Sequence, residues 1–172
     1  TMKTTIIGLG LIGGSIALGL RKSGLATELI GVDMNSTNAM KAVELGLVDK
    51  ILPEDEAIAK ADLIIVAIPV NALHAFLPAV LDAVKKDAVV IDSGSTKGLI
   101  CKSVSNHPKR SQFVAAHQIA GTENSGPTAA FHGLFKGKTN IICEASKSSE
   151  QALARARQVF DQQVSDGSRC RF

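Results

Sequence analysis

Three glycines near the amino terminus and one acid further along the chain have the types and spacing needed to bind a dinucleotide. Residues 8–13 read Gly-Leu-Gly-Leu-Ile-Gly, and Asp33 follows 20 residues later. In a turn between a strand and a helix, Gly8 allows the tight bend and Gly10 lets the backbone approach a pyrophosphate. Gly13 then allows the helix to pack closely on the strand. The pattern predicts a dinucleotide-binding turn.

The start of the following helix and the acid indicate how such a ligand would be held. The free backbone N–H groups at Leu11 and Ile12 would face the phosphates, where the helix dipole favours negative charge. Asp33 would accept hydrogen bonds from both hydroxyls of the adenosine ribose and would repel a 2′-phosphate. No arginine follows to bind such a phosphate, since the next residues are Met34, Asn35 and Ser36. We therefore expect NAD rather than NADP; a plain glycine turn with a capping aspartate is the alternative.

Ser15 stands in a second pattern, because residues 13–17 read Gly-Gly-Ser-Ile-Ala and superficially resemble a nucleophile elbow. That motif needs an exposed serine on a sharp turn from strand to helix. Ser15 instead falls inside the first turn of the predicted phosphate-binding helix. We reject a hydrolase on this ground.

The elements that must position these residues alternate between strand and helix. Short β-branched runs predict strands at residues 4–7, 29–33, 63–68, 89–92, 113–116 and 139–143. Apolar residues at helical spacing predict helices at 11–23, 37–45, 72–84, 96–104 and 149–164. Ser36 and Gly46 are expected as the N-cap and the C′ glycine of the second helix. Because most of the strands are apolar without alternation, helices should cover both faces of the sheet. The fold class is α/β, a Rossmann-type, doubly wound, mainly parallel sheet.

Composition excludes several other classes of protein. The 172 residues are 45% hydrophobic and 20% charged, which is typical of one folded domain rather than a disordered tail. No apolar run approaches the ~20 residues of a membrane-spanning helix. The cysteines are odd in number and widely spaced, which favours reduced thiols in a cytoplasmic protein over a disulfide framework or a metal site; they are Cys101, Cys143 and Cys170.

Charge and aromatic content give no sign of a nucleic-acid partner. The net charge is only +3, and residues 1–134 hold 12 basic and 12 acidic side chains. The sequence has no Trp or Tyr on which bases could stack. We expect a small-molecule substrate instead.

The second half of the site should lie beyond the carboxyl ends of the strands, as in other open α/β sheets. Three such ends carry Pro69, Ser95 and His117. Pro69 would end its strand and turn the chain over the cofactor. Taken singly, Ser95 is equally well explained as a helix cap and His117 as a strand-end histidine bonded to backbone.

Two longer segments around these residues resemble prephenate dehydrogenase, the NAD(P)-dependent enzyme of tyrosine biosynthesis. Residues 92–98 read Asp-Ser-Gly-Ser-Thr-Lys-Gly, and residues 117–127 read His-Gln-Ile-Ala-Gly-Thr-Glu-Asn-Ser-Gly-Pro. The likeness continues in shorter segments and covers about residues 3–164, which we take as an NAD-binding domain spanning 1–164. Gln118 stands where the family usually has proline.

The resemblance implies an activity and residues to carry it. Members of this family oxidise and decarboxylate prephenate to 4-hydroxyphenylpyruvate. By this likeness His117 would take the proton from the ring C4 hydroxyl, and Ser95 would orient that hydroxyl and the histidine. Thr122 and Glu123 would line the substrate side. A neutral imidazole suits the role of a base at pH 7.

The resemblance leaves the substrate open. Arogenate carries an amine in place of the keto group of prephenate, so arogenate dehydrogenase is a close alternative. A non-catalytic NAD-binding module is another, although cofactor binding alone needs neither Ser95 nor His117. The family also has a helical domain that forms a homodimer and supplies an arginine for the substrate. Residues 1–172 do not contain that domain, and we expect residues 165–172 to be an atypical tail.

Overall fold

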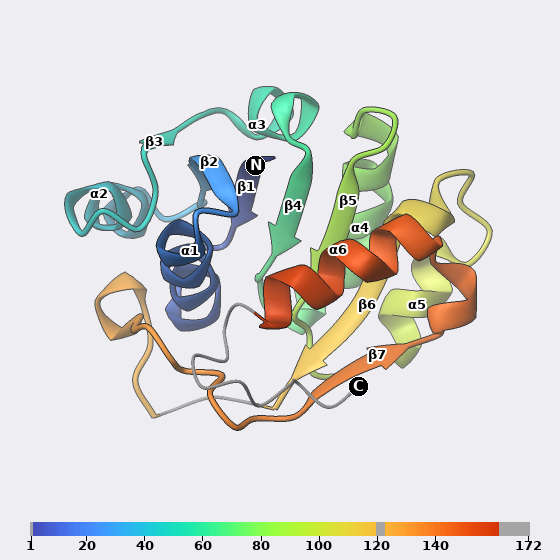
Figure 1. Ribbon diagram of the computed structural model, residues 1–172. Coiled ribbons are helices and arrows are strands. Elements are labelled where there is room, and N and C mark those ends of the chain that lie inside the picture. Colours follow the sequence, from blue (N-terminus) through green and yellow to red (C-terminus); the bar gives the residue numbers. More distant parts are fainter. Residues whose placement is uncertain (1, 120–122, 162–172) are drawn as a thin grey trace.

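A seven-stranded sheet forms the centre of the molecule. The computed structural model describes residues 2–119 and 123–161, and its strand order is β3-β2-β1-β4-β5-β6-β7 (Figure 1). Neighbouring strands from β3 to β6 run parallel, and β7 runs antiparallel to β6. The strands are β1 (Met2–Ile7), β2 (Ala26–Val32), β3 (Lys50–Ile51), β4 (Leu63–Val66), β5 (Val89–Asp92), β6 (Phe113–Gln118) and β7 (Asn140–Cys143).

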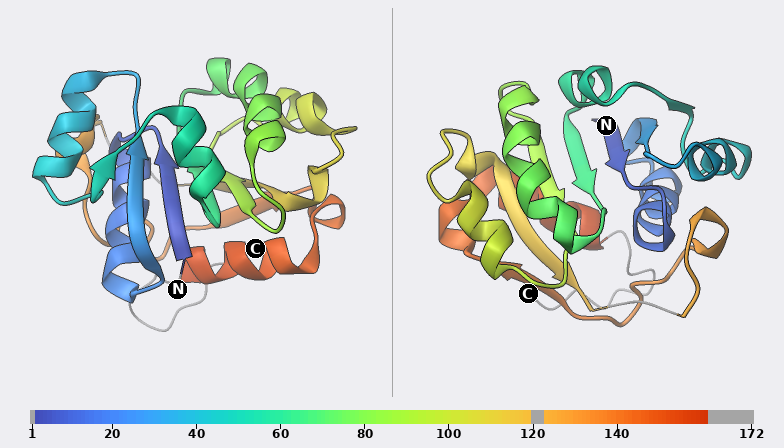
Figure 2. Two further views of the ribbon diagram at one scale, coloured as in Figure 1. Left: turned by 90° about the horizontal axis from the view of Figure 1, so that it is seen from above. Right: turned by 180° about the vertical axis from the view of Figure 1, so that it is seen from behind.

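Helices cover both faces of this sheet. They are α1 (Leu11–Ser23), α2 (Ser36–Glu44), α3 (Glu54–Lys60), α4 (Val70–Ala83), α5 (Gly98–Val104) and α6 (Glu150–Asp161). Three 3₁₀ turns lie between them, namely η1 (Arg110–Gln112), η2 (Pro127–Ala129) and η3 (Ala145–Lys147). Apolar side chains of α1 and α6 fill one core and those of α3, α4 and α5 fill the other, so the two sets lie on opposite sides of the sheet (Figure 2). The predicted doubly wound α/β fold is confirmed.

The strand register aligns the carboxyl ends of the parallel strands along one edge of the sheet. Val32, Ile7, Val66, Asp92 and Ala115 are paired in turn across β2, β1, β4, β5 and β6. The chain leaves the sheet directly after this row in β2, β1, β4 and β5, whereas β6 continues to Gln118, paired with β7. This register places the glycine turn, Asp33 and the ends of β4, β5 and β6 beside one another.

The predicted elements agree with the structure to the residue for α1 and β5, and the other predicted elements differ by up to three residues at described ends. Two elements were not predicted: β3 has only two residues, and α3 is too short to show a helical period. The expected N-cap Ser36 was wrong, because the side chain of Asn35 accepts from the backbone N–H of Asn38 at 3.1 Å and takes that position. Gly46 follows the helix with φ +69°, as expected.

The carboxyl ends of β4 and β5 also differ from the prediction. Strand β4 ends at Val66 rather than at Pro69, which is the N-cap of α4. Helix α5 begins at Gly98 after Lys97, with no side-chain cap, so Ser95 does not cap it. In the turn formed by residues 93–97, Lys97 bonds Asp92 and the hydroxyl of Ser93 donates to the carbonyl of Val66, while Ser95 is exposed.

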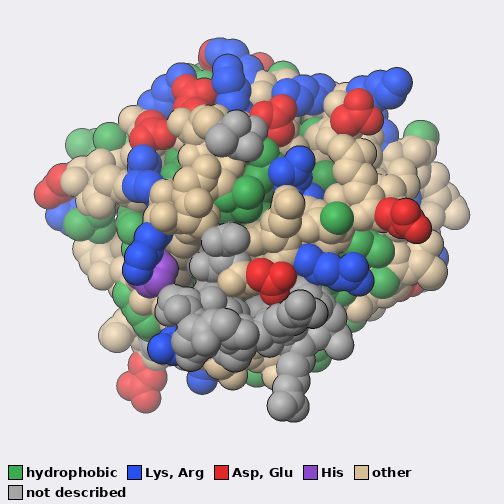
Figure 3. All heavy atoms as spheres, viewed as in Figure 1, with side chains coloured by type: hydrophobic (Ala, Val, Ile, Leu, Met, Phe, Trp, Pro, Cys, Tyr) green, Lys and Arg blue, Asp and Glu red, His purple; other side chains and the backbone are tan. Residues whose placement is uncertain are grey.

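The surface carries both signs of charge. In Figure 3, basic and acidic side chains lie side by side over the face that is shown. Within residues 2–119 and 123–161, no helix is both long and apolar enough to cross a membrane. The same residues hold no group of three or more His, Cys, Asp or Glu side chains that could bind a metal ion. Cys101 and Cys143 are free thiols, and Cys170 lies outside the described residues.

Candidate functional site

One cavity of about 910 Å³ opens at the carboxyl ends of the strands. It brings together most of the residues that the sequence analysis singled out, which are Gly8, Gly10, Leu11, Ile12, Asp33, Pro69, Ser95 and His117. Gly13 is buried behind the turn, as its predicted packing role requires. Glu123 is exposed and does not line the cavity, although Asn124 beside it does. Thr122 lies outside the described residues.

The three glycines of the turn are needed for different reasons. Gly8 has φ +92°, and a Cβ there would lie 2.4 Å from the carbonyl oxygen of Ala67. A Cβ on Gly13 would lie 2.0 Å from the carbonyl oxygen of Gly8. A Cβ on Gly10, by contrast, would meet no atom of the described residues within 4 Å, apart from its two chain neighbours. Packing within the chain explains glycine at 8 and 13 but not at 10, where the turn leaves room for a ligand to approach the backbone.

Helix α1 begins at this turn, directly after Gly10. Its N-cap is Gly10, no side chain caps it, and its first turn contains no acidic residue. Helix α3, for comparison, has Glu54, Asp55 and Glu56 in its first turn. An uncapped N-terminus with a positive dipole end is suited to an anionic group such as a pyrophosphate. Together with the open space at Gly10, it fits a dinucleotide.

Asp33 lies directly after β2 and holds the glycine turn in place. Its Oδ2 accepts a hydrogen bond from the backbone N–H of Leu9, and its Oδ1 accepts one from Asn35, both at 2.8 Å. A carboxylate has about four acceptor positions, so each oxygen can accept one further bond from the cavity. The two alternatives weighed for Asp33 are thus compatible, since it caps a turn and still faces the ligand space.

Further residues line the same end of the cavity. Met34 is fully exposed, and Asn38 and Glu54 join it from α2 and α3. Glu54 adds a second carboxylate to the lining of this cavity. Asn38 and Glu54 could not be predicted from the sequence, because α3 shows no helical period and nothing in the sequence indicates that α2 and α3 meet here.

A buried ion pair organises the other end of the site. The carboxylate of Asp92, at the end of β5, is fully buried and bonds the ammonium of Lys97, which is 10% exposed. Asp92 also accepts from the backbone N–H of Gly94 at 3.0 Å and from that of Ala116 at 3.1 Å. Burial raises the pKa of the Asp92 carboxyl against the opposing effect of Lys97, and burial lowers the pKa of Lys97. These bonds join the turn after β5 to strand β6.

Ser95 and His117 are consequently held on neighbouring parts of the cavity wall. Ser95 follows Gly94 and is exposed; His117 follows Ala116 and is partly buried. The two side chains do not hydrogen-bond each other within the described part of the chain, and each is open to the cavity. A hydroxyl and an imidazole are suited to hold and move a proton on a bound molecule.

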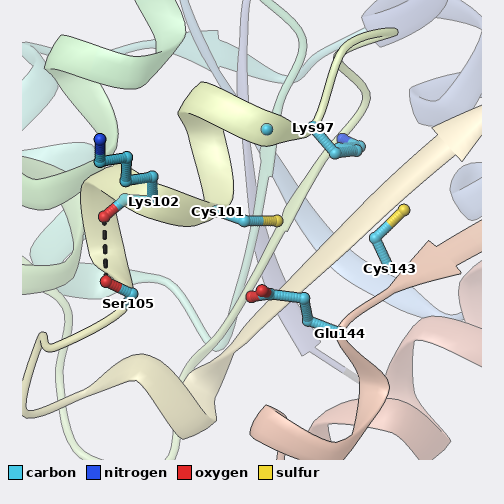
Figure 4. A pocket seen from close by; sticks show the side chains of 7 residues that line it. Lys97, Cys101, Lys102, Ser105, Cys143 and Glu144 are labelled. Carbon is cyan, nitrogen blue, oxygen red and sulfur yellow. Dashed lines mark hydrogen bonds between the residues drawn. The ribbon is translucent and has the colours of Figure 1, made fainter.

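A second, smaller cavity of about 370 Å³ lies beside α5 and β7, lined by Lys97, Gly98, Cys101, Lys102, Ser105, Cys143 and Glu144 (Figure 4). Burial raises the pKa of the Cys101 thiol, which makes it a poor nucleophile. Glu144 is paired with Arg110 and Lys147. Lys97 and Glu144 are thus held in ion pairs, and the chemistry predicted from the sequence lies in the larger cavity.

The sequence matches the family model described as "Prephenate dehydrogenase, nucleotide-binding domain" over residues 16–165. The chain belongs to the prephenate dehydrogenase family. This confirms the family that residues 92–98 and 117–127 indicated.

Two relatives are similar in sequence to most of this chain. The prephenate dehydrogenase of Bacillus subtilis is 32% identical over 164 residues, which are 92% of this chain and 44% of that protein. The cyclohexadienyl dehydrogenase of Zymomonas mobilis is 33% identical over 150 residues, covering 87% of this chain and 51% of that protein. The chain thus spans about half the length of these relatives.

Solved structures of the family agree with the fold. The prephenate dehydrogenase of A. aeolicus, in complex with hydroxyphenyl propionate and NAD+, has a TM-score of 0.86 and 30% identity over 95% of this chain and 58% of that one. Synechocystis arogenate dehydrogenase has a TM-score of 0.84 and 30% identity over the same shares. The family's nucleotide-binding domain is therefore the part that this chain contains.

Proposed function

We propose that this chain is the NAD-binding part of a dehydrogenase that oxidises and decarboxylates prephenate to 4-hydroxyphenylpyruvate. The observation that carries the proposal is that one cavity unites two kinds of residue. Gly10 and Asp33 at one end are suited to a dinucleotide, and Ser95 and His117 at the other are suited to proton transfer. Membership of the family supports the reaction class.

The residues of the first half of the site would hold NAD. The backbone at Gly10, Leu11 and Ile12 would receive the pyrophosphate, and the remaining acceptor positions of Asp33 would bind the ribose hydroxyls. Asp33 and Glu54 contribute two carboxylates to the cavity. The 2′-phosphate of NADP would be repelled by these carboxylates, which favours NAD. When bound, NAD accepts a hydride from the substrate.

The residues of the second half would manage the proton. In this proposal His117 accepts the proton of the ring C4 hydroxyl, so that the oxygen becomes a carbonyl as the C4–H bond is lost with its electron pair. Ser95 holds the hydroxyl toward the imidazole. The bond from ring carbon C1 to its carboxylate then breaks and carbon dioxide leaves. The electron pair of that bond moves through the ring to the C4 oxygen, which takes a proton back from His117, and the ring becomes an aromatic phenol. Asp92 holds the backbone beside both residues, through the N–H groups of Gly94 and Ala116, and does not line the cavity.

The substrate side of the cavity follows His117 in the sequence. We retain Thr122 and Glu123 as proposed substrate residues. The support for this is that Asn124 and Ser125, next along the chain, line the cavity.

Arogenate is the alternative substrate. The observation in its favour is that Synechocystis arogenate dehydrogenase and the A. aeolicus prephenate dehydrogenase are both 30% identical to this chain. The two substrates share the ring, the C4 hydroxyl and the departing carboxylate, so the roles of Ser95 and His117 are the same for both. A non-catalytic NAD-binding module would leave that pair without a role.

The test has two parts, because the relatives are about twice as long as this chain. Calorimetric titration of the 172-residue chain with NAD measures the cofactor site alone. Formation of NADH by the longer protein, with prephenate or arogenate at saturating NAD, measures the reaction; sedimentation of that protein tests the expected homodimer. NAD binding without turnover of either substrate would leave the non-catalytic module as the better explanation.

A further inference from the structure

The segment that follows the substrate-side residues is fastened to helix α1. Asn124, Ser125 and Gly126 line the large cavity, and the chain then forms η2. Beyond η2, the backbone N–H of Phe131 donates a hydrogen bond to Oγ of Ser15 at 3.1 Å. Figure 1 shows this segment lying beside α1 and α2. Ser15 is only 1% exposed, and the bond is partly buried.

Gly14, next to Ser15, packs closely against the same segment. Its backbone is helical, so no unusual conformation calls for glycine, and alanine is the better helix former. A Cβ on Gly14 would lie 2.7 Å from the Cβ of Ala130, well inside the usual carbon–carbon contact distance of about 3.5–4.0 Å. The other near atom is Cδ1 of Leu47 at 3.1 Å, the end of a flexible side chain. Close packing of Ala130 on α1 is what excludes a side chain at position 14.

The path from this contact to the cavity is short and tightly turned. Gly126 has φ +80° and accepts a hydrogen bond from the backbone N–H of Ala129, and Pro127 is buried. Ala130 donates to the carbonyl of Pro127 at 3.1 Å. A displacement at Ala130 or Phe131 is therefore passed through a single hydrogen-bonded turn to the residues on the cavity wall.

We propose that Gly14 and Ser15 are positioning residues that set the substrate-side wall of the cavity, at Asn124 to Gly126, relative to the helix that receives the cofactor phosphates. The inference rests on the proposed function for the identity of the substrate. It assigns a role to the Gly-Gly-Ser sequence that the dinucleotide-binding pattern does not explain beyond Gly13. Neither residue touches the cavity, so both act through the segment they hold.

The first experiment measures the contact itself in the 172-residue chain. Ser15→Ala removes the acceptor of the Phe131 N–H, and amide hydrogen exchange at Phe131 should become about fivefold faster, as for the loss of one ordinary hydrogen bond. Ser23→Ala is the matched control, because this hydroxyl lies at the far end of α1 and bonds only locally to Leu20 and Leu25. Equal exchange at Phe131 in the parent chain and Ser15→Ala would overturn the proposal, and this readout needs no turnover.

The second experiment uses the longer protein. It enlarges Gly14 and then compensates by making its contact Ala130 smaller. Gly14→Ala should raise the KM for prephenate about tenfold, since small misplacements of a site are costly, while the Kd for NAD stays within twofold. The double variant Gly14→Ala/Ala130→Gly removes the clashing methyl and should return the KM to within twofold of the parent. If the contact between Gly14 and Ala130 only stabilised the fold, Gly14→Ala would lower Tm. It would not raise the KM for prephenate while leaving kcat and the Kd for NAD unchanged.

The outcomes separate the two proposals. If the parent protein oxidises neither prephenate nor arogenate, the proposed function fails while the exchange experiment still tests the contact. A double variant as impaired as Gly14→Ala, or a loss of NAD affinity parallel to the rise in KM, overturns the positioning role. If Gly14→Ala alone does not fold, the double variant and Ser15→Ala decide by the same KM and Kd comparison.

Discussion

The carboxylate of Asp92 accepts a hydrogen bond from the backbone N–H of Ala116, the residue before His117, at 3.1 Å. The same carboxylate accepts one from Gly94, the residue before Ser95, and bonds the buried ammonium of Lys97. One buried side chain therefore fixes the backbone on which both candidate catalytic residues stand. Its loss should be felt in stability as well as in catalysis.

Asp92→Asn should lower the free energy of unfolding by about 3–5 kcal/mol, because it leaves the Lys97 ammonium buried without a carboxylate. Urea denaturation of the 172-residue chain measures this. Asp62→Asn is the matched control: its pair with Lys85 is about 40% exposed on both sides, and such pairs contribute about 1 kcal/mol or less. Similar losses in the two variants would show that the buried pair does not hold the site together.

Gly10→Ala and Gly13→Ala should separate ligand binding from folding. Alanine at 10 meets no protein atom, so stability should change by about 1 kcal/mol or less. Its methyl group would occupy the space proposed for the pyrophosphate and should weaken NAD binding at least about tenfold. Alanine at 13 would collide with the Gly8 carbonyl and should destabilise the chain by about 3 kcal/mol or more. Thermal melts and NAD titrations of both variants provide the comparison, and unchanged NAD affinity in Gly10→Ala would count against the phosphate site.

The chain should bind NAD at least about tenfold more tightly than NADP, since a 2′-phosphate would face the carboxylates of Asp33 and Glu54. Asp33→Ala should narrow this difference mainly by weakening the binding of NAD, because it removes the proposed ribose contacts and also the bond that holds Leu9. Calorimetric titration with both cofactors measures the ratio. Equal or reversed affinities in the parent chain would contradict the assignment of Asp33.

His117→Asn in the longer protein should lower kcat by ~10²–10⁴, the usual contribution of a general base, and should leave the Kd for NAD unchanged. Steady-state rates with prephenate, beside an NAD titration of the variant, test both points. Normal turnover by His117→Asn would require another base.

The sequence was sufficient for those parts of the fold and site that depend on local chemistry. The glycine turn, Asp33 and the alternation of apolar strands with helices are each determined within a few residues, so α1 and β5 were predicted to the residue. Glu54 and Asn38 could not be foreseen, because they reach the cavity only through the packing of α2 and α3. The double role of Asp92 also depends on long-range pairing, since it requires β5 and β6 to be in register. The N-cap of α2 was predicted one residue late, at Ser36 instead of Asn35, because serine and asparagine have similar capping ability and stand side by side.

The bond between Ser15 and Phe131 joins residues 116 positions apart in the chain. During synthesis, α1 leaves the ribosome long before its partner segment exists. Strand β1 likewise lies between β2 and β4, so residues 2–32 cannot complete their packing as an isolated strand–helix–strand unit. Closing so long a loop costs conformational entropy, and contacts of this separation slow folding. Helix α1 is thus made well before the segment that completes its packing.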